Sequence, residues 1–361
     1  MKKTYDPVYY GDYLGLDRLL SSQQPVSPKY GAEAHEEMLF IIVHQAYELW
    51  FKQIIHELRS VLSIFKQSSI ADEQLMTLVH RLQRVVTIQN LLNQQIDVME
   101  TMTAQEFLEF RDYLVPASGF QSIQFKEIEI SLGVKRDKRI AFDQASFYNR
   151  INDDDRAYLA GLEEQLDLFT LVDAWLARMP FLELENFSFW QHYQRAIESQ
   201  LEQDEGIVRG NPLLSAEEVE TELKELANTR ANFAALFDSE LYEEMRAAGR
   251  VRLSQRALQA ALFIHLYREE PAFNLPYQVL DSLADIDENL TIWRYRHVMM
   301  VQRMLGSKIG TGGSSGHEYL KKTTEKNRIF ADFMNLATYL VPKSTLPNLP
   351  ANVRDKLRRG I

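Results

Sequence analysis

The sequence has no cysteine among its 361 residues. This absence excludes disulfides, thiolate zinc sites, iron–sulfur clusters, and haem that is held by a thiolate or attached through a CxxCH motif. Common metal motifs without cysteine are also missing, since none of the eight histidines lies in an HExxH motif or three residues after a glutamate. The sequence therefore argues against cofactors that need several protein ligands, and a haem held by one histidine is the leading candidate.

Excess positive charge and long apolar runs are missing as well. The net charge of −11 argues against nucleic-acid binding, which needs a concentration of lysine and arginine. Lys2 and Lys3 are not followed by an apolar segment of the kind that a signal peptide contains. The longest strongly apolar stretch, residues 38–47, has about half the length that a membrane span requires. We expect a cytoplasmic protein that binds neither nucleic acid nor membranes.

Glycine is scarce, and a third of it is concentrated in one place. The chain has 15 glycines, fewer than the usual share of about 7% would give, and five of them fall within residues 306–316. The cluster matches neither a GxxxxGK[ST] phosphate loop nor a complete GxGxxG motif. Two interpretations stay open: a flexible linker, or a loop whose backbone approaches a ligand closely and whose Thr311 offers a hydroxyl.

The spacing of apolar residues predicts an all-α protein. Apolar side chains recur every three or four positions, for example over residues 79–100, whereas sustained alternation and short hairpin turns are missing. Helices are expected to stop where proline and glycine gather, at residues 115–119, 209–212, 269–276 and 341–350.

A change in composition predicts how the chain is divided. Residues 135–250 are rich in charge, and the segments on either side are more apolar. We therefore expect a discontinuous helical core of residues 35–134 and 251–345, with residues 135–250 as a charged helical insertion. An N-terminal segment of residues 1–34 and a C-terminal tail of residues 346–361 complete the division.

His44 lies in LFIIVHQAYELWF, residues 39–51. A helix that is apolar around most of its circumference is buried, so a histidine there needs a hydrogen-bond partner. Glu48, one turn later, or a backbone carbonyl would satisfy the ring in an ordinary helical core. The alternative is a ring that contacts a ligand, and this stretch alone does not decide between them.

His297 shares one helical stripe with Trp293, Met300 and Met304. An apolar, polarisable stripe around a histidine suits a flat macrocycle. The same residues also occur in ordinary helical cores, so both interpretations stay open at this point.

Arg111 follows a signal for the start of a helix. Thr103 and Glu106 form a capping box, which predicts a helix that begins beside them and ends before the following proline. Phe107 then lies one turn before Arg111 on the same face. A guanidinium in this setting offers a bidentate fork to a carboxylate, and a salt bridge with Glu106 or Asp112 is an equally supported alternative.

Taken together, these segments resemble the tryptophan 2,3-dioxygenase family. The runs that carry the resemblance occur in the family's order: YGDYLGLDRLL (10–20), HEEMLFIIVHQAYELWFKQI (35–54), FRDYLVPASGFQSIQF (110–125), YREEPAFNLPYQVL (267–280), WRYRHVMMVQRMLGSK (293–308) and GTGGSSG (310–316). The combination of GTGGSSG with the HQAYELW run is highly specific, and the resemblance covers nearly the whole chain.

The resemblance implies an all-α homotetramer, a dimer of dimers, that binds one haem b in each subunit. It implies oxidative opening of the indole ring of L-tryptophan by O₂ to give N-formyl-L-kynurenine, the first step of tryptophan degradation. Two other functions stay open: a haem enzyme of the same fold that adds one oxygen atom to another indole, and a haem sensor without enzymatic activity.

The resemblance also gives roles to particular residues. His297 matches the axial ligand of the haem iron, and His44 matches the histidine that hydrogen-bonds the indole N–H. Arg111 matches the partner of the substrate carboxylate, and Thr311 matches the contact of the substrate ammonium. The other residues expected at the site are Ser118 and Gly119 in a turn over the haem, Ser118, Phe40, Ile41, Ile42, Val43 and Phe107 around the substrate, and Tyr10, Tyr13 and Leu14 from a neighbouring subunit.

Two positions depart from the family pattern. Phe107 stands where some bacterial members have tyrosine, which removes a hydroxyl from the pocket and keeps its apolar wall. Asp287 stands where some members have glutamate. Neither departure affects the residues expected to hold the iron or the substrate carboxylate.

Overall fold

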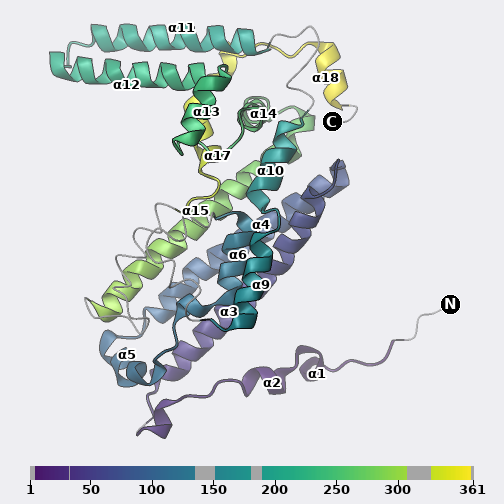
Figure 1. Ribbon diagram of the computed structural model, residues 1–361, viewed down its shortest axis with the longest axis vertical. Helices are drawn as coiled ribbons and strands as arrows, with labels where there is room; N and C mark the ends of the chain where they lie inside the picture. The colour runs from purple at the N-terminus through teal and green to yellow at the C-terminus, as the bar shows by residue number, and fades with distance from the viewer. Residues whose placement is uncertain (1–4, 32, 135–150, 180–188, 307–326, 359–361) are drawn as a thin grey trace.

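The computed structural model describes residues 5–31, 33–134, 151–179, 189–306 and 327–358 (Figure 1). Within these ranges the regular structure consists of α-helices and short 3-10 helices, without a strand. The predicted all-α fold is therefore confirmed. None of the helices in the described ranges combines the length and the apolar character that crossing a bilayer requires.

The described helices range from single turns to a helix of 35 residues. The α-helices are α1 (Tyr10–Leu14), α2 (Leu16–Leu20), α3 (Glu36–Phe65), α4 (Asp72–Met99), α5 (Ala104–Arg111), α6 (Ile123–Leu132), α9 (Asp153–Glu163), α10 (Leu168–Ala177), α11 (Phe189–Gly210), α12 (Ala216–Ala235), α13 (Ser239–Ala247), α14 (Gln255–Leu266), α15 (Pro271–Leu305), α17 (Ala331–Asn335) and α18 (Ala351–Arg358). The 3-10 helices are η1 (Ser27–Lys29), η2 (Asp112–Leu114), η3 (Gly119–Gln121), η5 (Leu336–Tyr339) and η6 (Lys343–Thr345).

The long helices α3, α4 and α15 lie along one another and form the centre of the molecule (Figure 1). α6 and α10 pack against α3, and α14 packs against α10 and α15. One continuous cluster of buried apolar side chains runs through these helices. α11 and α12 form an antiparallel pair at one end of the molecule, whereas α5 lies at the opposite end, beside α3 and α15.

Two buried amide side chains tie α4 to α15. Gln89 on α4 donates a hydrogen bond from Nε2 to the backbone carbonyl of Ile286 at 3.3 Å. One turn later, Asn93 donates from Nδ2 to the backbone carbonyl of Asn289 at 3.2 Å. A buried polar group that loses its partner costs about 1–3 kcal/mol, so these bonds favour one alignment of the two helices.

Buried charges on α15 hold the backbone around Asn327 and Ile329, shortly before α17. Asp287 is fully buried and accepts the backbone N–H of Ile329 at 2.7 Å. Arg294 donates to the backbone carbonyl of Asn327 at 3.4 Å and to the Glu129 carboxylate on α6 at 2.7 Å. Asp287, one of the two departures from the family pattern, thus anchors the backbone at Ile329.

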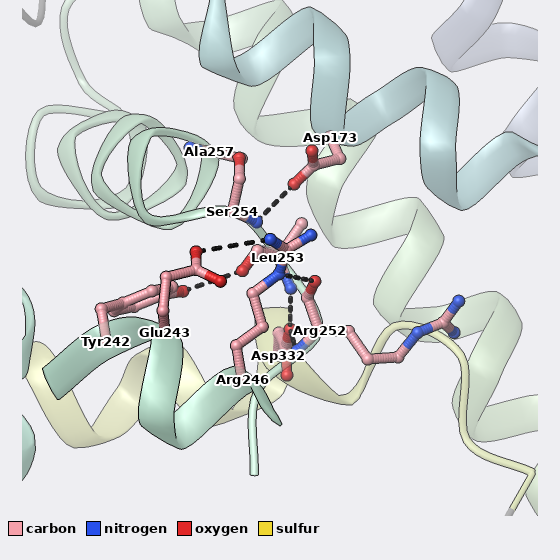
Figure 2. Close-up of polar contacts among 9 residues, drawn as sticks. All are labelled: Asp173, Tyr242, Glu243, Arg246, Arg252, Leu253, Ser254, Ala257 and Asp332. Atoms are coloured by element: carbon pink, nitrogen blue, oxygen red, sulfur yellow. Dashed lines mark hydrogen bonds and ion pairs between the residues drawn. The ribbon is translucent and has the colours of Figure 1, made fainter. Parts of the chain in front are cut away.

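Side chains from three helices hold the short segment that leads into α14 (Figure 2). Asp332 on α17 accepts the backbone N–H groups of Arg252 and Leu253 at 2.7 and 2.8 Å. Tyr242 on α13 donates to the carbonyl of Leu253 at 3.1 Å. Asp173 on α10 accepts the next backbone N–H at 2.6 Å. These bonds satisfy buried and partly buried backbone groups that lie outside any helix.

α1 and α2 belong to a segment that extends away from the other helices (Figure 1). Neither helix contains a buried residue. Tyr10 and Tyr13 are 76% and 77% exposed, and Leu14 is 45% exposed. The segment is tied to α3 where the backbone N–H of Ser27 donates to Glu37 at 2.9 Å. Its aromatic surface is therefore left uncovered by its own chain.

The helix boundary near residues 269–276 differs in part from the expectation. α14 ends at Leu266, as the pattern predicts, but α15 begins at Pro271 and continues through Pro276. Pro271 occupies the first helical position, where the missing N–H has no helical partner to lose. Pro276 is buried in the core, and this packing offsets the one backbone hydrogen bond that its ring removes.

Candidate active site

The helix that carries Arg111 begins at the capping box predicted from the sequence. Thr103 precedes α5, and its hydroxyl oxygen accepts the backbone N–H of Glu106 at 3.3 Å. Glu106 in return accepts the backbone N–H of Thr103 at 2.8 Å. Arg111 is the last residue of α5, and Phe107 lies one turn before it. The reciprocal caps fix the start of α5 and thereby the positions of both side chains.

Phenylalanines from α3 and α5 meet beside His44. The ring centroid of Phe40 lies 4.1 Å from that of His44. It lies 5.7 Å from the ring centroid of Phe107 and 5.6 Å from that of Phe110. The same apolar cluster includes Met304 on α15. Three helices that are far apart in the sequence therefore form one apolar surface.

His297 lies on α15 between two apolar clusters. Its ring stacks on the indole of Trp293, with centroids 5.2 Å apart and an angle of 5° between the planes. Trp293 packs against the main core, whereas Met300 and Met304 belong to the cluster around Phe40. The predicted stripe of tryptophan, histidine and methionine is therefore present, and it connects the core to the site.

The hydrogen bond of His44 identifies which of its nitrogens carries the proton. Nδ1 lies 2.7 Å from the backbone carbonyl oxygen of Phe40. A carbonyl oxygen only accepts, so Nδ1 is the donor, and Nε2 of the neutral ring is an acceptor. Of the two partners expected from the sequence, the backbone carbonyl is the one observed. Glu48 instead accepts a hydrogen bond from Gln124 at 2.7 Å.

The surroundings favour the neutral form of both imidazoles. Burial lowers the pKa of His44, against the opposing effects of the Phe40 carbonyl and Glu48. Burial also lowers the pKa of His297 to about 4, and the charge of His44 adds to this effect. In the single chain, however, His297 is half-buried and His44 is exposed, so the burial expected for His44 from the sequence is not observed, because neighbouring positions of α3 face in different directions. The charge of one ring affects the pKa of the other, so His44 on α3 and His297 on α15 belong to the same region of the molecule.

Arg111 ends α5, and a turn that contains Ser118 and Gly119 follows it. The Arg111 side chain is 16% exposed, and its Nη1 lies 3.4 Å from the carboxylate of Asp112, whose side chain is 84% exposed. An ion pair with so exposed a partner contributes about 0–1 kcal/mol. Ser118 donates its backbone N–H to Gln121 at 3.0 Å. Gly119 begins η3, and a Cβ there would meet no atom within 4 Å.

The remaining residues expected at the site differ in how far their side chains are exposed. On α3, Val43 is buried, Ile41 is half-buried and Ile42 is 49% exposed, since neighbouring positions of a helix point in different directions. The residues expected from a neighbouring subunit, Tyr10, Tyr13 and Leu14, lie on the exposed N-terminal segment. Thr311 and the glycine-rich run around it lie outside the described residues.

The surroundings of His297 fit a single protein ligand to haem. Its Nδ1 is buried and has no hydrogen-bond partner within the described residues. The side chains on its stripe are the indole of Trp293 and the thioether of Met300, which suit the apolar face of a porphyrin. The neutral imidazole that burial favours is also the form that binds iron.

Sequence analysis missed two residues that hold Trp293. Tyr47 on α3 presents its ring edge to the indole with centroids 6.1 Å apart, and its hydroxyl donates to the carbonyl of Leu92 at 2.8 Å. Phe125 on α6 lies 5.0 Å from the indole centroid. Tyr47 is three residues after His44, so helical spacing could have placed it on the same face. The sequence around Phe125 contains no comparable signal.

Comparisons with known proteins identify the family to which this chain belongs. The family model described as tryptophan 2,3-dioxygenase matches residues 2–340. A tryptophan 2,3-dioxygenase of Alteromonas mediterranea is 60% identical over 357 residues, which cover 99% of either chain. The enzyme of that name from Bdellovibrio bacteriovorus is 47% identical over 98% of either chain, and the one from Mus musculus is 44% identical over 94% of this chain and 84% of its own. The chain belongs to the tryptophan 2,3-dioxygenase family.

Proposed function

We propose that this protein catalyses the oxidative opening of the indole ring of L-tryptophan by O₂, which gives N-formyl-L-kynurenine. The observation that carries the proposal is the family match over residues 2–340. The motif residues on α3, α5 and α15 gather around one apolar cluster, which supports it independently. The reaction is the first step of tryptophan degradation.

In this proposal, His297 holds one haem b in each subunit through its neutral imidazole. Haem, when bound, supplies the O₂-activating chemistry that amino-acid side chains lack. Apolar side chains such as Phe40 and Met300 keep water away from the reacting groups. Ser118 and Gly119 belong to the turn that covers the haem, and the open space beside Gly119 supports a close approach of the backbone.

Polar anchors orient the substrate above this surface. Arg111 binds the carboxylate through its guanidinium fork. His44 accepts the indole N–H at Nε2, because Nδ1 already donates to the Phe40 carbonyl. Thr311 contacts the ammonium, an assignment that rests on the sequence resemblance alone. A site with such anchors rejects analogues that lack the matching group, since its own polar atoms are then left unpaired.

Apolar side chains form the walls around the indole ring. Phe40 and Phe107 stack at 5.7 Å between ring centroids and provide the flat surface against which an indole packs. Val43 supports them from the buried side of α3. Ile41 and Ile42 complete the set that the resemblance assigns to the pocket.

We further propose that the enzyme is a homotetramer, a dimer of dimers, with shared sites. The N-terminal segment of residues 1–34 reaches the site of a neighbouring subunit, where Tyr10, Tyr13 and Leu14 cover the substrate. The exposure of these three side chains supports this arrangement, because uncovered aromatic surface favours contact with another chain. Residues 35–134 and 251–345 form the core that binds haem and substrate, and residues 135–250 the insertion. A cytoplasmic location stays a prediction from the sequence.

Product analysis under isotopically labelled oxygen tests the proposed reaction. The haem-loaded, reduced enzyme is mixed with L-tryptophan and ¹⁸O₂, and the product is examined by mass spectrometry. We expect a product that has gained two labelled oxygen atoms, together with O₂ consumption that depends on L-tryptophan. Tryptamine, which lacks the carboxylate, serves as the control substrate and should react much more slowly.

Two other outcomes would overturn the proposal. A product with one labelled oxygen atom would identify a mono-oxygenase of the same fold. Binding of haem without any O₂ consumption that depends on L-tryptophan would identify a haem-binding protein without this activity.

A further inference from the structure

Within the described residues, no protein hydrogen bond sets the rotation of the His297 imidazole. A histidine that binds a metal almost always donates its second ring N–H to a carboxylate, a carbonyl or water, and this bond fixes the rotation of the ring. Nδ1 of His297 is buried and has no hydrogen-bond partner within the described residues. The carboxylate of Asp97, on the neighbouring α4, is instead paired with Arg296.

The indole of Trp293 stacks on the imidazole of His297. The two planes are within 5° of parallel, with ring centroids 5.2 Å apart. The residues are four positions apart on α15, so the helix itself brings the rings together. Rotation of the imidazole about its bond to Cβ would break the parallel contact and drive the ring edge into the indole.

Trp293 is in turn held by residues from two other helices. Tyr47 on α3 presents its edge to the indole at an interplanar angle of 67°, and Phe125 on α6 lies 5.0 Å away. The Tyr47 hydroxyl is fixed by its hydrogen bond to the carbonyl of Leu92 on α4. The indole is therefore confined by the central helices and cannot turn with the imidazole.

We propose that Trp293 is a positioning residue, which orients the imidazole of His297 toward the haem iron by parallel stacking. This inference rests on the proposed role of His297 as the iron ligand. Tyr47 and Phe125 act through Trp293, by holding the indole in its plane. No carboxylate within the described residues accepts the N–H of this imidazole, so when bound to iron it would donate less electron density than a carboxylate-bonded histidine does.

Substitutions at Trp293 separate stacking from simple space filling. Trp293→Phe keeps a flat ring, whereas Trp293→Met fills much of the space without one. Trp190→Leu is the matched control, because Trp190 is also half-buried and packs against Phe189 at 4.8 Å in a cluster around α11. The holoenzymes are compared by the iron–histidine stretching band in resonance Raman spectra and by the rate of haem transfer to an apoglobin.

We expect Trp293→Met to broaden and shift the iron–histidine band and to accelerate haem loss about 10- to 100-fold, the usual effect of losing a group that orients a metal ligand. Trp293→Phe should keep a band close to that of the unmodified enzyme, and Trp190→Leu should change neither quantity. Tyr47→Leu keeps the indole of Trp293 but removes one of the side chains that hold it. This variant should broaden the iron–histidine band less than Trp293→Met does, and it provides a second test if Trp293→Met does not fold.

An unchanged band and haem-loss rate in Trp293→Met, or an equal effect of Trp190→Leu, would overturn the inference. His297→Ala distinguishes this failure from failure of the proposed function. If His297→Ala keeps the Soret band and haem affinity of the unmodified enzyme, the iron ligand itself lies elsewhere. If His297→Ala loses haem while Trp293→Met behaves normally, only the role of Trp293 is wrong.

Discussion

His44 and His297 differ in what holds their rings. His44 donates from Nδ1 to the Phe40 carbonyl, which fixes the tautomer as well as the rotation of the ring. His297 has no such acceptor within the described residues and stacks on Trp293. The first arrangement suits a ring that must present an acceptor at one defined atom. In the second arrangement, the plane of the ring follows the indole on which it stacks.

At Arg111 we expect the largest effect on substrate binding. Arg111→Ala removes the partner of the substrate carboxylate and leaves that charge without compensation, at a cost of roughly 2–4 kcal/mol. This corresponds to a decrease in kcat/KM for L-tryptophan of about 30- to 1,000-fold. The same variant should lose little activity toward tryptamine, which has no carboxylate. An equal loss for both substrates would mean that the carboxylate is bound elsewhere.

His44→Ala should slow the reaction without abolishing it. The variant loses one hydrogen bond to the indole N–H, worth roughly 1–3 kcal/mol, so kcat/KM should fall about 5- to 150-fold. Substrate methylated at the indole nitrogen cannot donate to Nε2, and the variant should discriminate against it less than the unmodified enzyme does. Complete loss of turnover in a variant with intact haem absorbance would contradict this role.

The buried ion pair of Glu129 on α6 and Arg294 on α15 should contribute measurably to the free energy of unfolding. Both side chains are nearly inaccessible, so Arg294→Met should leave a buried carboxylate and lower the free energy of unfolding by about 3–5 kcal/mol. Glu129→Gln combined with Arg294→Met removes the unpaired charge and should recover most of this loss. Urea denaturation of the single and double variants measures it, and strictly additive effects would refute the coupling.

His265 on α14 should make the stability of the protein depend on pH. Burial lowers the pKa of His265, despite the opposing effect of the Ala261 carbonyl, so the unfolded chain takes up a proton at a higher pH than the folded one. The stability that the neutral ring contributes is present above the unfolded pKa of about 6.5 and is lost as the pH falls below it. His265→Gln should therefore lose less stability than the unmodified protein between pH 7.5 and 5.5.

Denaturation curves at both pH values check this prediction. The exposed His56 provides the control, because His56→Gln removes a histidine from the surface of α3. The advantage in stability of the unmodified protein over His265→Gln should be larger at pH 7.5 than at pH 5.5. A difference that is independent of pH would show that the ring contributes packing alone.

Local sequence signals predicted the helices of the site more reliably than the contacts that those helices make with one another. The capping box at Thr103 gave the start of α5, and helical spacing gave the stripe around His297, because both depend on residues within a few turns. The contact of Trp293 with Phe125 depends on how α6 packs against α15, and a single helix does not specify which neighbour covers its apolar face. Pro276 inside α15 was missed for the same reason, since packing with distant residues offsets the lost bond.

For the whole molecule, the N-terminal segment predicts that subunits complement one another. Arg111→Ala gives a subunit with a defective pocket and an intact segment, and Tyr10→Ala combined with Tyr13→Ala gives the reverse. If the segment serves a neighbouring site, oligomers that contain both kinds of subunit should include complete sites. Their activity should exceed the sum of the two variants measured separately.

Co-expression with two different affinity tags isolates the mixed oligomers for this assay. Mixing the purified variants without exchange of subunits is the control and should give only the summed activity. Mixed oligomers that are no more active than this sum would mean that each segment serves its own chain or no site.

α4 packs against both helices that carry the imidazoles, α3 with His44 and α15 with His297. It holds α15 through the amides of Gln89 and Asn93 and holds α3 through the carbonyl of Leu92. A displacement of α15 by one helical turn would carry His297 about 5.4 Å and would leave both amides opposite the wrong carbonyls. The two amides therefore favour one alignment of α15 along α4, and with it one position of His297 relative to α4.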